Sequence, residues 1–331
     1  MKSSRRTFIK TSSMGLAAVG TASLLPSVLK ARATGKALPF KLALSQFSLA
    51  SQFWTKKLDP LDFPQKTVSS FGISGLDYCS MFFADKAKND AFLAELKKRA
   101  LDNGCYNLRI MVDGEGVLGD LKKEVRTKAV ENHYKWIDAA ASLGCPMIRV
   151  NVEGEGDPKE VAKAAMESLN ALIDYGRKAS IDVIVENHIG ISCNGDWLAG
   201  LMKEMNNPHC GTLADFGNFC INRTKPPTND LAGWMQTKCL EEYDRYKGIR
   251  ELIPYAKGVH AKTHLFDANG NDIETDFGKM FKIISDAGYK GWISVEYEGG
   301  LLKMYGKDSK YLDDDAGVLA TKKLIEKVAT V

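Results

Sequence analysis

The sequence predicts a single (β/α)8 TIM barrel over residues 38–330, preceded by a twin-arginine signal peptide over residues 1–33. Three observations support this. After about Ala37, short apolar runs alternate eight times with longer amphipathic segments, at roughly 37 residues per unit, which suits such a barrel. No GxGxxG motif follows the first apolar run, which disfavours a doubly wound open sheet. No linker divides the chain into two domains.

The N-terminal segment has the features of an export signal. The basic stretch Ser4-Arg5-Arg6-Thr7-Phe8-Ile9-Lys10 precedes an apolar run from Met14 to Leu25, and Ala31-Arg32-Ala33 offers a cleavage site. The arginine pair indicates the twin-arginine route. The apolar run is about half of the ~20 residues that span a bilayer. We therefore expect a periplasmic protein without stable membrane insertion after processing, with a membrane tether as the alternative.

Composition and charge exclude several classes of protein. Hydrophobic residues make up 44% of the 331 residues and charged residues 26%, which is ordinary for a globular protein. Residues 1–33 hold six basic and no acidic residues, so the rest of the chain carries −2 of the net charge of +4. A mildly acidic mature chain disfavours a nucleic-acid partner. The seven cysteines form no CxxC pair, and we expect most of them to be buried without a disulfide framework.

The predicted strands are short and apolar, as expected for strands buried on both faces. They are Phe40–Leu49, Ile73–Ser80, Cys105–Val112, Cys145–Val152, Ile181–Glu186, Cys210–Phe216, Gly258–Lys262 and Trp292–Glu296.

The predicted helices follow the strands in turn, and several begin at Asp and end at Gly, which are favoured capping residues. They are Asp62–Ser70, Asp85–Asn103, Lys122–Leu143, Asp157–Ser180, Asp196–Met205, Asp230–Ala256, Asp276–Ala287 and Asp314–Val328. The loop Asn222–Asn229, with Arg223 and Lys225, reads as a flexible basic loop.

Four consecutive strands end in a side chain that binds metals. These are Glu186, Asp215, His260 and Glu296. A lone carboxylate at the end of an apolar strand is costly to bury, whereas four such groups around a shared cation are not. An oxygen and nitrogen ligand set suits one divalent ion, either Mn²⁺, Mg²⁺, Co²⁺ or Zn²⁺. Taken singly, a strand-end Asp or Glu is more often a helix N-cap or an ion-pair partner, and a single His is more often a core residue; the pattern on four consecutive strands indicates a shared site.

Other polar residues near the strand ends are candidates for binding substrate. His188 and Lys262 each lie two residues beyond a predicted ligand and should point the same way. Arg149, Asn151 and Glu153 alternate at the end of the fourth strand. Asn218 and His264 are further candidates, whereas His133 and His209 fall at positions that indicate structural roles.

These residues resemble the metal set of a known superfamily. Glu186 in VENH, Asp215 in ADFGN, His260 in GVHAK and Glu296 in SVEYEG are similar to the Glu-Asp-His-Glu set of the xylose isomerase-like TIM barrels. The resemblance covers residues 38–330 and implies that the four residues bind one divalent ion. It also implies that Glu186 and Glu296 act as acid and base on a carbohydrate.

The resemblance leaves three functions open. The first is a metal-dependent isomerase or epimerase that removes a proton next to a carbonyl of a non-phosphorylated sugar or sugar derivative. The second is a lyase or hydratase that acts on 3-keto-glycosides, and the third is a non-catalytic sugar-binding protein.

Ketose 3-epimerases carry an Arg soon after the ligating His and a His three residues after the Asp; here Asn218 follows Asp215 and no Arg follows His260. Oligomeric state, the sugar and the metal stay open.

Overall fold

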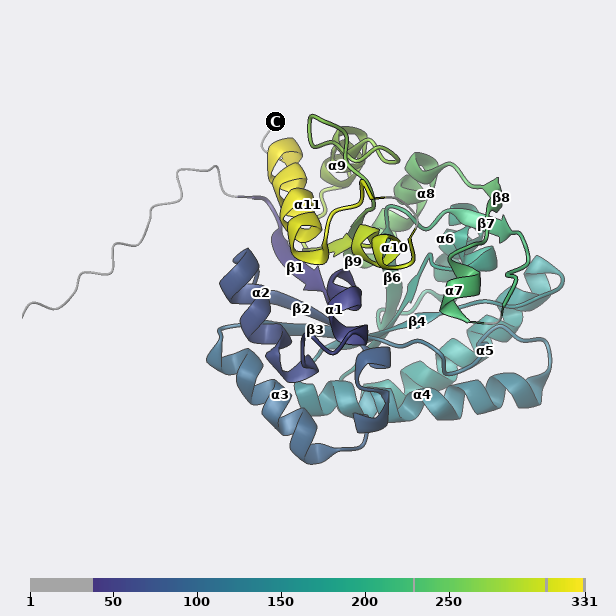
Figure 1. Cartoon of the computed structure of the whole chain (residues 1–331). Coiled ribbons are helices and arrows are strands. Elements are labelled where there is room, and N and C mark those ends of the chain that lie inside the picture. The colour runs from purple at the N-terminus through teal and green to yellow at the C-terminus, as the bar shows by residue number, and fades with distance from the viewer. Residues whose placement is uncertain (1–37, 229, 307–308, 330–331) are drawn as a thin grey trace, which may run out of the picture. The chain divides into compact units, whose positions relative to one another are not determined.

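Eight parallel strands close into a barrel in the computed structural model, which describes residues 38–228, 230–306 and 309–329 (Figure 1). The predicted signal peptide lies outside these described residues. The barrel order is β1-β10-β9-β6-β5-β4-β3-β2. The strands are β1 (Lys41–Ser45), β2 (Gly75–Cys79), β3 (Tyr106–Met111), β4 (Met147–Asn151), β5 (Asp182–Glu186), β6 (Cys210–Asp215), β9 (Ala256–Thr263) and β10 (Trp292–Tyr297). The predicted fold is confirmed, and each predicted strand overlaps an observed one.

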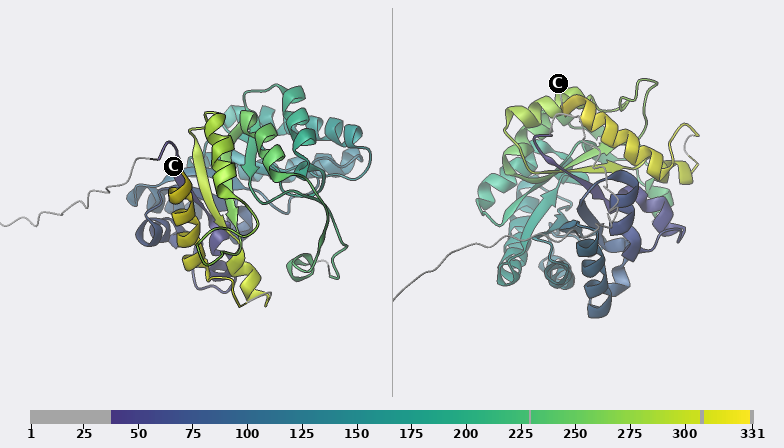
Figure 2. Two further views of the ribbon diagram at one scale, coloured as in Figure 1. Left: turned by 90° about the horizontal axis from the view of Figure 1, so that it is seen from above. Right: turned by 90° about the vertical axis from the view of Figure 1, so that its left-hand side faces the viewer.

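One longer helix follows each strand and packs around the outside of the barrel (Figures 1 and 2). These helices are α2 (Phe63–Phe71), α3 (Asp90–Asp102), α4 (Lys123–Leu143), α5 (Pro158–Gly176), α6 (Gly195–Met205), α8 (Arg245–Leu252), α9 (Phe277–Asp286) and α11 (Asp314–Ala329). Asp157, Asp244 and Asp276 accept hydrogen bonds from first-turn N–H groups of α5, α8 and α9. Such N-caps explain why these helices begin where they do. Within the described residues, none of the helices is both long and apolar enough to cross a bilayer.

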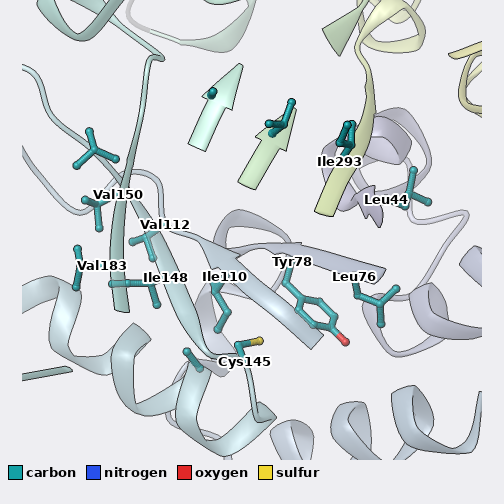
Figure 3. Close-up of a cluster of buried hydrophobic side chains, with 14 of the residues drawn as sticks. Leu44, Leu76, Tyr78, Ile110, Val112, Cys145, Ile148, Val150, Val183 and Ile293 are labelled. Atoms are coloured by element: carbon teal, nitrogen blue, oxygen red, sulfur yellow. The ribbon is translucent and has the colours of Figure 1, made fainter. Parts of the chain in front are cut away.

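Strand alternation divides the side chains of the barrel into two sets. Alternate residues such as Ile148, Val150 and Val183 belong to the large apolar core, which includes helix residues (Figure 3). The residues between them, such as Arg149 and Glu186, point into the barrel, where many are polar and still buried. The interior of the barrel is therefore the place where charged groups meet.

The prediction of one helix over Asp230–Ala256 was wrong. This segment contains a short helix, α7 (Leu231–Trp234), the strand β8 (Cys239–Glu242) and α8. Strand β8 pairs with β7 (Cys220–Arg223) in an antiparallel hairpin, which replaces the flexible loop expected around Arg223. The pairing of β8 with β7 outweighs the helical pattern that this segment shows in the sequence. The hairpin and α7 project beyond the barrel in the left view of Figure 2.

A disulfide between Cys220 and Cys239 joins the two strands of this hairpin. The expectation of no disulfide framework was therefore wrong for this pair. The other five cysteines are free and buried, as expected: Cys79, Cys105, Cys145, Cys193 and Cys210.

Some boundaries also differ from the sequence prediction. Helix α3 begins at Asp90 rather than Asp85, and α5 ends at Gly176, followed by a 3-10 turn over Arg177–Ala179. Two short helices near the barrel mouth, α1 (Ala50–Trp54) and α10 (Gly299–Met304), were not predicted. They are too short to show a helical periodicity.

Two helical glycines provide a test of the packing of α11 against the barrel. A Cβ at Gly317 in α11 would lie 2.1 Å from the ring of Tyr297 on β10, whereas a Cβ at Gly200 in α6 would meet nothing within 4 Å. Gly317→Ala should therefore lower the free energy of unfolding by about 1–3 kcal/mol through overpacking. Gly200→Ala should leave it unchanged or raise it by up to about 1 kcal/mol, because Ala favours helix. Urea denaturation of both variants measures the difference, and equal effects would contradict the close packing.

Candidate metal and substrate site

Glu186, Asp215, His260 and Glu296 converge inside the mouth of the barrel. They come from β5, β6, β9 and β10, which are neighbours on the closed sheet in the order β10-β9-β6-β5. One ligand atom of each residue lies within 4.8 Å of the others, and all four side chains are buried. The carboxyl ends of parallel strands meet at one rim, so four sequence-distant residues form one cluster.

The atoms of this cluster fit a cation. His260 Nδ1 lies 3.0 Å from a Glu296 oxygen, 3.4 Å from a Glu186 oxygen and 3.8 Å from an Asp215 oxygen. Glu186 Oε2 and Asp215 Oδ2 are buried and accept no hydrogen bond. Buried carboxylate oxygens normally accept hydrogen bonds, and Asp215 Oδ2 has only the longer contacts of 3.6 Å to Lys262 Nζ and 3.8 Å to His260 Nδ1, so it is available to an ion. Oxygen and imidazole ligands suit a divalent metal.

A second polar layer lies deeper in the barrel, centred on Asp77 of β2. Its carboxylate accepts hydrogen bonds from Arg109 Nε at 2.9 Å and Ser294 Oγ at 2.5 Å, and lies 3.3 Å from His260 Nε2. Asp77 and Arg109 are almost completely buried. A Cβ at residue 258 would come within 1.9 Å of the Arg109 guanidinium, so Gly258 makes room for it. Because Asp77 engages Nε2, the ring of His260 directs Nδ1 toward the carboxylate cluster.

Arg149 of β4 lies beside the cluster. Its Nε is 2.8 Å from Glu186 Oε2, an ion pair that is not aligned as a hydrogen bond, and its Nη1 donates to Asp113 at 2.8 Å. Asn151 is occupied by Arg149 and Asp113. Of the three β4 candidates for substrate binding, only Arg149 lines the pocket, whereas Asn151 and Glu153 do not. The hydrogen bonds of Asn151 hold its side chain against Asp113, and substrate binding by Asn151 and Glu153 stays a prediction.

Lys262 of β9 forms the opposite side of the cluster. Its Nζ lies 3.1 Å from Glu296 and donates to Glu298 at 2.7 Å. Glu298 also lies 3.4 Å from His264, whose other ring nitrogen is 3.1 Å from Glu274. These two carboxylates raise the pKa of His264 to about 10, although burial opposes its protonation. Lys262 and His264 thus face the pocket as cations.

Burial and neighbouring charges shift the pKa values of the carboxylates in opposite directions. Burial acts to raise the pKa of Glu186, but the Arg149 charge holds it below its ordinary value. Glu296 is likewise held well below its usual pKa, against burial, by His260. Burial and the carboxylates of Glu296 and Glu186 raise the pKa of Asp215 well above its ordinary value. The negative charges of Glu296 and Glu186 thus disfavour a charged Asp215, and a bound cation would offset this repulsion.

Glu186 and Glu296 of the cluster line the floor of a pocket of about 830 Å³, whereas Asp215 and His260 are fully buried and do not line it. Arg149, Lys262 and His188 line it, together with Asn218 and His264. His188 Nδ1 is buried without a partner, so it can donate to or accept from a ligand. His133 and His209 lie elsewhere, bonded to Ala129 and Asp182.

Sequence reasoning missed Asp77, Arg109, Asp113 and Glu298. Asp77 and Arg109 lie within predicted strands that are otherwise largely apolar. A charged residue at such a position could have indicated a buried functional group. Glu298 lies two residues beyond Glu296, the same spacing that identified His188 and Lys262.

Comparison with known proteins agrees with this architecture. The model of the family described as "Xylose isomerase-like TIM barrel" matches residues 67–321. No curated protein matches the chain in sequence. The chain shares the fold of a D-psicose 3-epimerase from Clostridium cellulolyticum H10, solved with D-tagatose, with a TM-score of 0.61 and 14% identity over 88% of this chain and 100% of the other.

Two further solved structures share the fold. The IOLI protein with a bound zinc atom has a TM-score of 0.62 and 12% identity over 88% of this chain and 98% of the other. A 3-keto-D-glucoside 4-epimerase from E. coli has a TM-score of 0.51 and 14% identity over 78% of this chain and 91% of the other.

The Asp77–Arg109 pair predicts a stability difference. Asp77→Ala leaves the Arg109 guanidinium buried without its carboxylate and should lower the free energy of unfolding by about 3–5 kcal/mol. The double variant Asp77→Leu/Arg109→Met should recover most of this loss, because it removes both charges. Glu95→Ala, which breaks a surface pair with Arg99, should change stability by less than about 1 kcal/mol. Urea denaturation measures all three, and a single variant as stable as the double variant would contradict the pairing.

Proposed function

Because the chain belongs to the xylose isomerase-like TIM-barrel family, we propose that it is a divalent-metal-dependent isomerase or epimerase of a non-phosphorylated sugar or sugar derivative. The observation that carries the proposal is the convergence of two glutamates, an aspartate and a histidine within 4.8 Å of one another, with both glutamates lining a pocket. Sugar epimerases are among the solved structures that share its fold.

The charges around the pocket floor support a bound cation. Four cationic side chains, Arg109, Arg149, Lys262 and His264, face six carboxylates in the two layers of the barrel. The carboxylates are Asp77, Asp113, Glu186, Asp215, Glu296 and Glu298. An excess of buried negative charge is costly unless a cation offsets it. Within the described residues, the two buried carboxylate oxygens that accept no hydrogen bond, Glu186 Oε2 and Asp215 Oδ2, belong to this cluster.

The residues that would hold the metal are Glu186, Asp215, His260 and Glu296. A divalent ion bound there would act as a Lewis acid that polarises a substrate carbonyl oxygen. The ligand set contains no sulfur, which favours Mn²⁺, Mg²⁺, Co²⁺ or Zn²⁺.

Proton transfer is assigned to Glu186 and Glu296. They stand on β5 and β10, which are separated by β6 and β9, so their carboxylates enter the pocket from different sides. One carboxylate can remove a proton from the carbon next to the carbonyl, and the other can return a proton to the opposite face. Return to the same carbon gives epimerisation, and return to the adjacent carbon gives isomerisation.

Two further side chains are suited to hold the substrate, and a third positions one of the glutamates. Lys262 presents an ammonium group next to Glu296 and can donate to a substrate oxygen. His188 has a free, buried ring nitrogen that can bind a hydroxyl group. Arg149 orients Glu186 through their ion pair.

The preference for a non-phosphorylated substrate follows from the predicted export signal. Phosphorylated sugars are chiefly cytoplasmic, and the chain is proposed to act in the periplasm. The disulfide between Cys220 and Cys239 supports this proposal, since disulfides persist in oxidising compartments.

Elimination from a 3-keto-glycoside is a second candidate, because the same proton abstraction can expel a leaving group. The shared fold of a protein named as a 3-keto-D-glucoside 4-epimerase favours it over other lyase reactions. Incubation with a panel of free sugars and 3-keto-glycosides in D₂O distinguishes the reactions. Deuterium at one carbon indicates epimerisation or isomerisation, whereas release of the aglycone indicates elimination. No exchange with any of them would favour a sugar-binding protein.

Replacing either glutamate tests the acid–base assignment. Glu186→Gln and Glu296→Gln should each lower the rate of deuterium exchange at least about a hundredfold, because the amide cannot accept the proton. Metal content is measured in parallel, and Glu167→Gln at an exposed ion pair serves as the control. Wild-type turnover by a variant that still binds metal would show that the assignment is wrong.

Removing the metal tests the ligand assignment without using activity. A ligand that binds only the folded state stabilises it by mass action, so chelation should lower the melting temperature by several degrees. In Asp215→Ala, the same chelator should produce a much smaller shift, because one ligand is missing. Differential scanning calorimetry with metal analysis measures both. An unchanged melting temperature after chelation of the wild-type chain would contradict a metal bound at this site.

A further inference from the structure

The pocket extends beyond the carboxylate cluster, and part of its lining there is apolar. A volume of about 830 Å³ is typical of sites for drug-sized ligands, which are larger than a single sugar ring. Aromatic and aliphatic side chains of this outer part are Phe47, Trp54, Met81, Leu231, Trp234 and Met235, and the polar side chains of Arg223, Thr237, Glu242 and Arg245 also line the pocket. A monosaccharide bound over the cluster would leave these side chains without a ligand.

The two walls come from different sides of the barrel mouth. Trp54 ends α1, just after β1, and its ring contacts Phe47 and Phe82 edge-on at 5.8 and 5.4 Å between centroids. Trp234 ends α7, in the connection that follows β6. Strands β1 and β6 are separated by β10 and β9 in the closed sheet. A ligand between these walls would therefore lie across the mouth, above the polar floor.

The wall that holds Trp234 is built as a fixed element. The Cys220–Cys239 disulfide closes the β7–β8 hairpin, and the Tyr243 N–H donates to the Phe219 carbonyl at 2.8 Å, next to the disulfide at the base of the same hairpin. Arg223 lies over the Trp234 ring at 5.5 Å from its centroid. A covalently closed hairpin keeps the Trp234 side of the pocket in place before a ligand binds.

The charged groups on this side favour an apolar occupant over an anionic one. Arg245 is paired with Glu242 through Nη2, and Arg223 is engaged with the Trp234 ring. Glu242 and Glu274 also line the pocket, and each is already paired with a cation, Arg245 and His264 respectively. The flat faces of tryptophan side chains instead favour stacking with another ring.

We propose that this outer region is a subsite for an apolar, ring-shaped aglycone, so that the substrate is a glycoside rather than a free monosaccharide. The inference rests on the proposed function, because it places the sugar end over Glu186, Asp215, His260 and Glu296. The walls at Trp54 and Trp234 bind the aglycone and determine specificity, while the floor performs the chemistry.

Binding of matched glycosides tests the subsite. Methyl and 4-nitrophenyl glycosides of glucose, galactose, mannose, xylose and 3-keto-glucose are titrated into the metal-loaded, oxidised chain by calorimetry. For each sugar that binds, the 4-nitrophenyl glycoside should bind at least about tenfold more tightly than the methyl glycoside, because its ring buries apolar surface between the two walls.

Variants locate this gain in affinity. Trp234→Ala should remove most of the difference between the two glycosides and leave methyl glycoside binding unchanged, whereas Trp234→Phe should retain part of it. Cys220→Ser/Cys239→Ser should also reduce the difference, because the hairpin is no longer closed. Leu240→Ala is the matched control, since Leu240 lies on the same hairpin, is 64% exposed and does not line the pocket. Circular dichroism and melting temperature show that each variant is folded.

The outcomes separate this inference from the proposed function. Equal affinity for methyl and 4-nitrophenyl glycosides would overturn the aglycone subsite and leave the sugar site standing. If the 4-nitrophenyl glycoside still bound more tightly than the methyl glycoside to both Trp234→Ala and Trp54→Ala, the aglycone subsite would also be overturned. If none of the glycosides, including the methyl series, bound the metal-loaded chain, both the proposed function and the subsite would be wrong.

Discussion

The structure depends on how a closed barrel accommodates buried negative charge. Alternate residues of every strand point inward, so charged side chains from distant parts of the sequence meet there. In the deeper layer, the charge of Asp77 is paired with that of Arg109, and Ser294 donates to the same carboxylate. The upper layer has more carboxylates than cations. His260 joins the two layers, with one ring nitrogen facing Asp77 and the other facing the cluster.

The fold and the pocket floor were predictable because they depend on local pattern and on one topological rule. Apolar runs of strand length alternate with amphipathic helices, and in a parallel barrel every strand ends at the same rim. Glu186, Asp215, His260 and Glu296 stand at the ends of their strands or near them, so their convergence follows from the fold alone. The same rule places His188 and Lys262 in the pocket, since they lie two residues further along.

The remaining parts depend on contacts that a single sequence does not specify. The pairing of Asp77 with Arg109 depends on the register between β2 and β3, which places these two residues opposite each other. Asn151 fits the alternation but is bonded to Asp113, which a reading of β4 alone could not anticipate. Cys220 and Cys239 are 19 residues apart, and the segment between them reads as loop and helix until β7 and β8 are known to pair.

Sequence prediction failed for the segment between β6 and α8, and this segment also differs from the barrel in how it is held. The floor residues are held by strands that pair with two neighbours each, so changing one of them disturbs the whole barrel. The hairpin instead pairs only with itself and is closed by its own disulfide. Its sequence can therefore change without altering strand register or the Asp77 layer. A segment with that freedom is suited to determine which substrate enters, while the strand ends determine the reaction that follows.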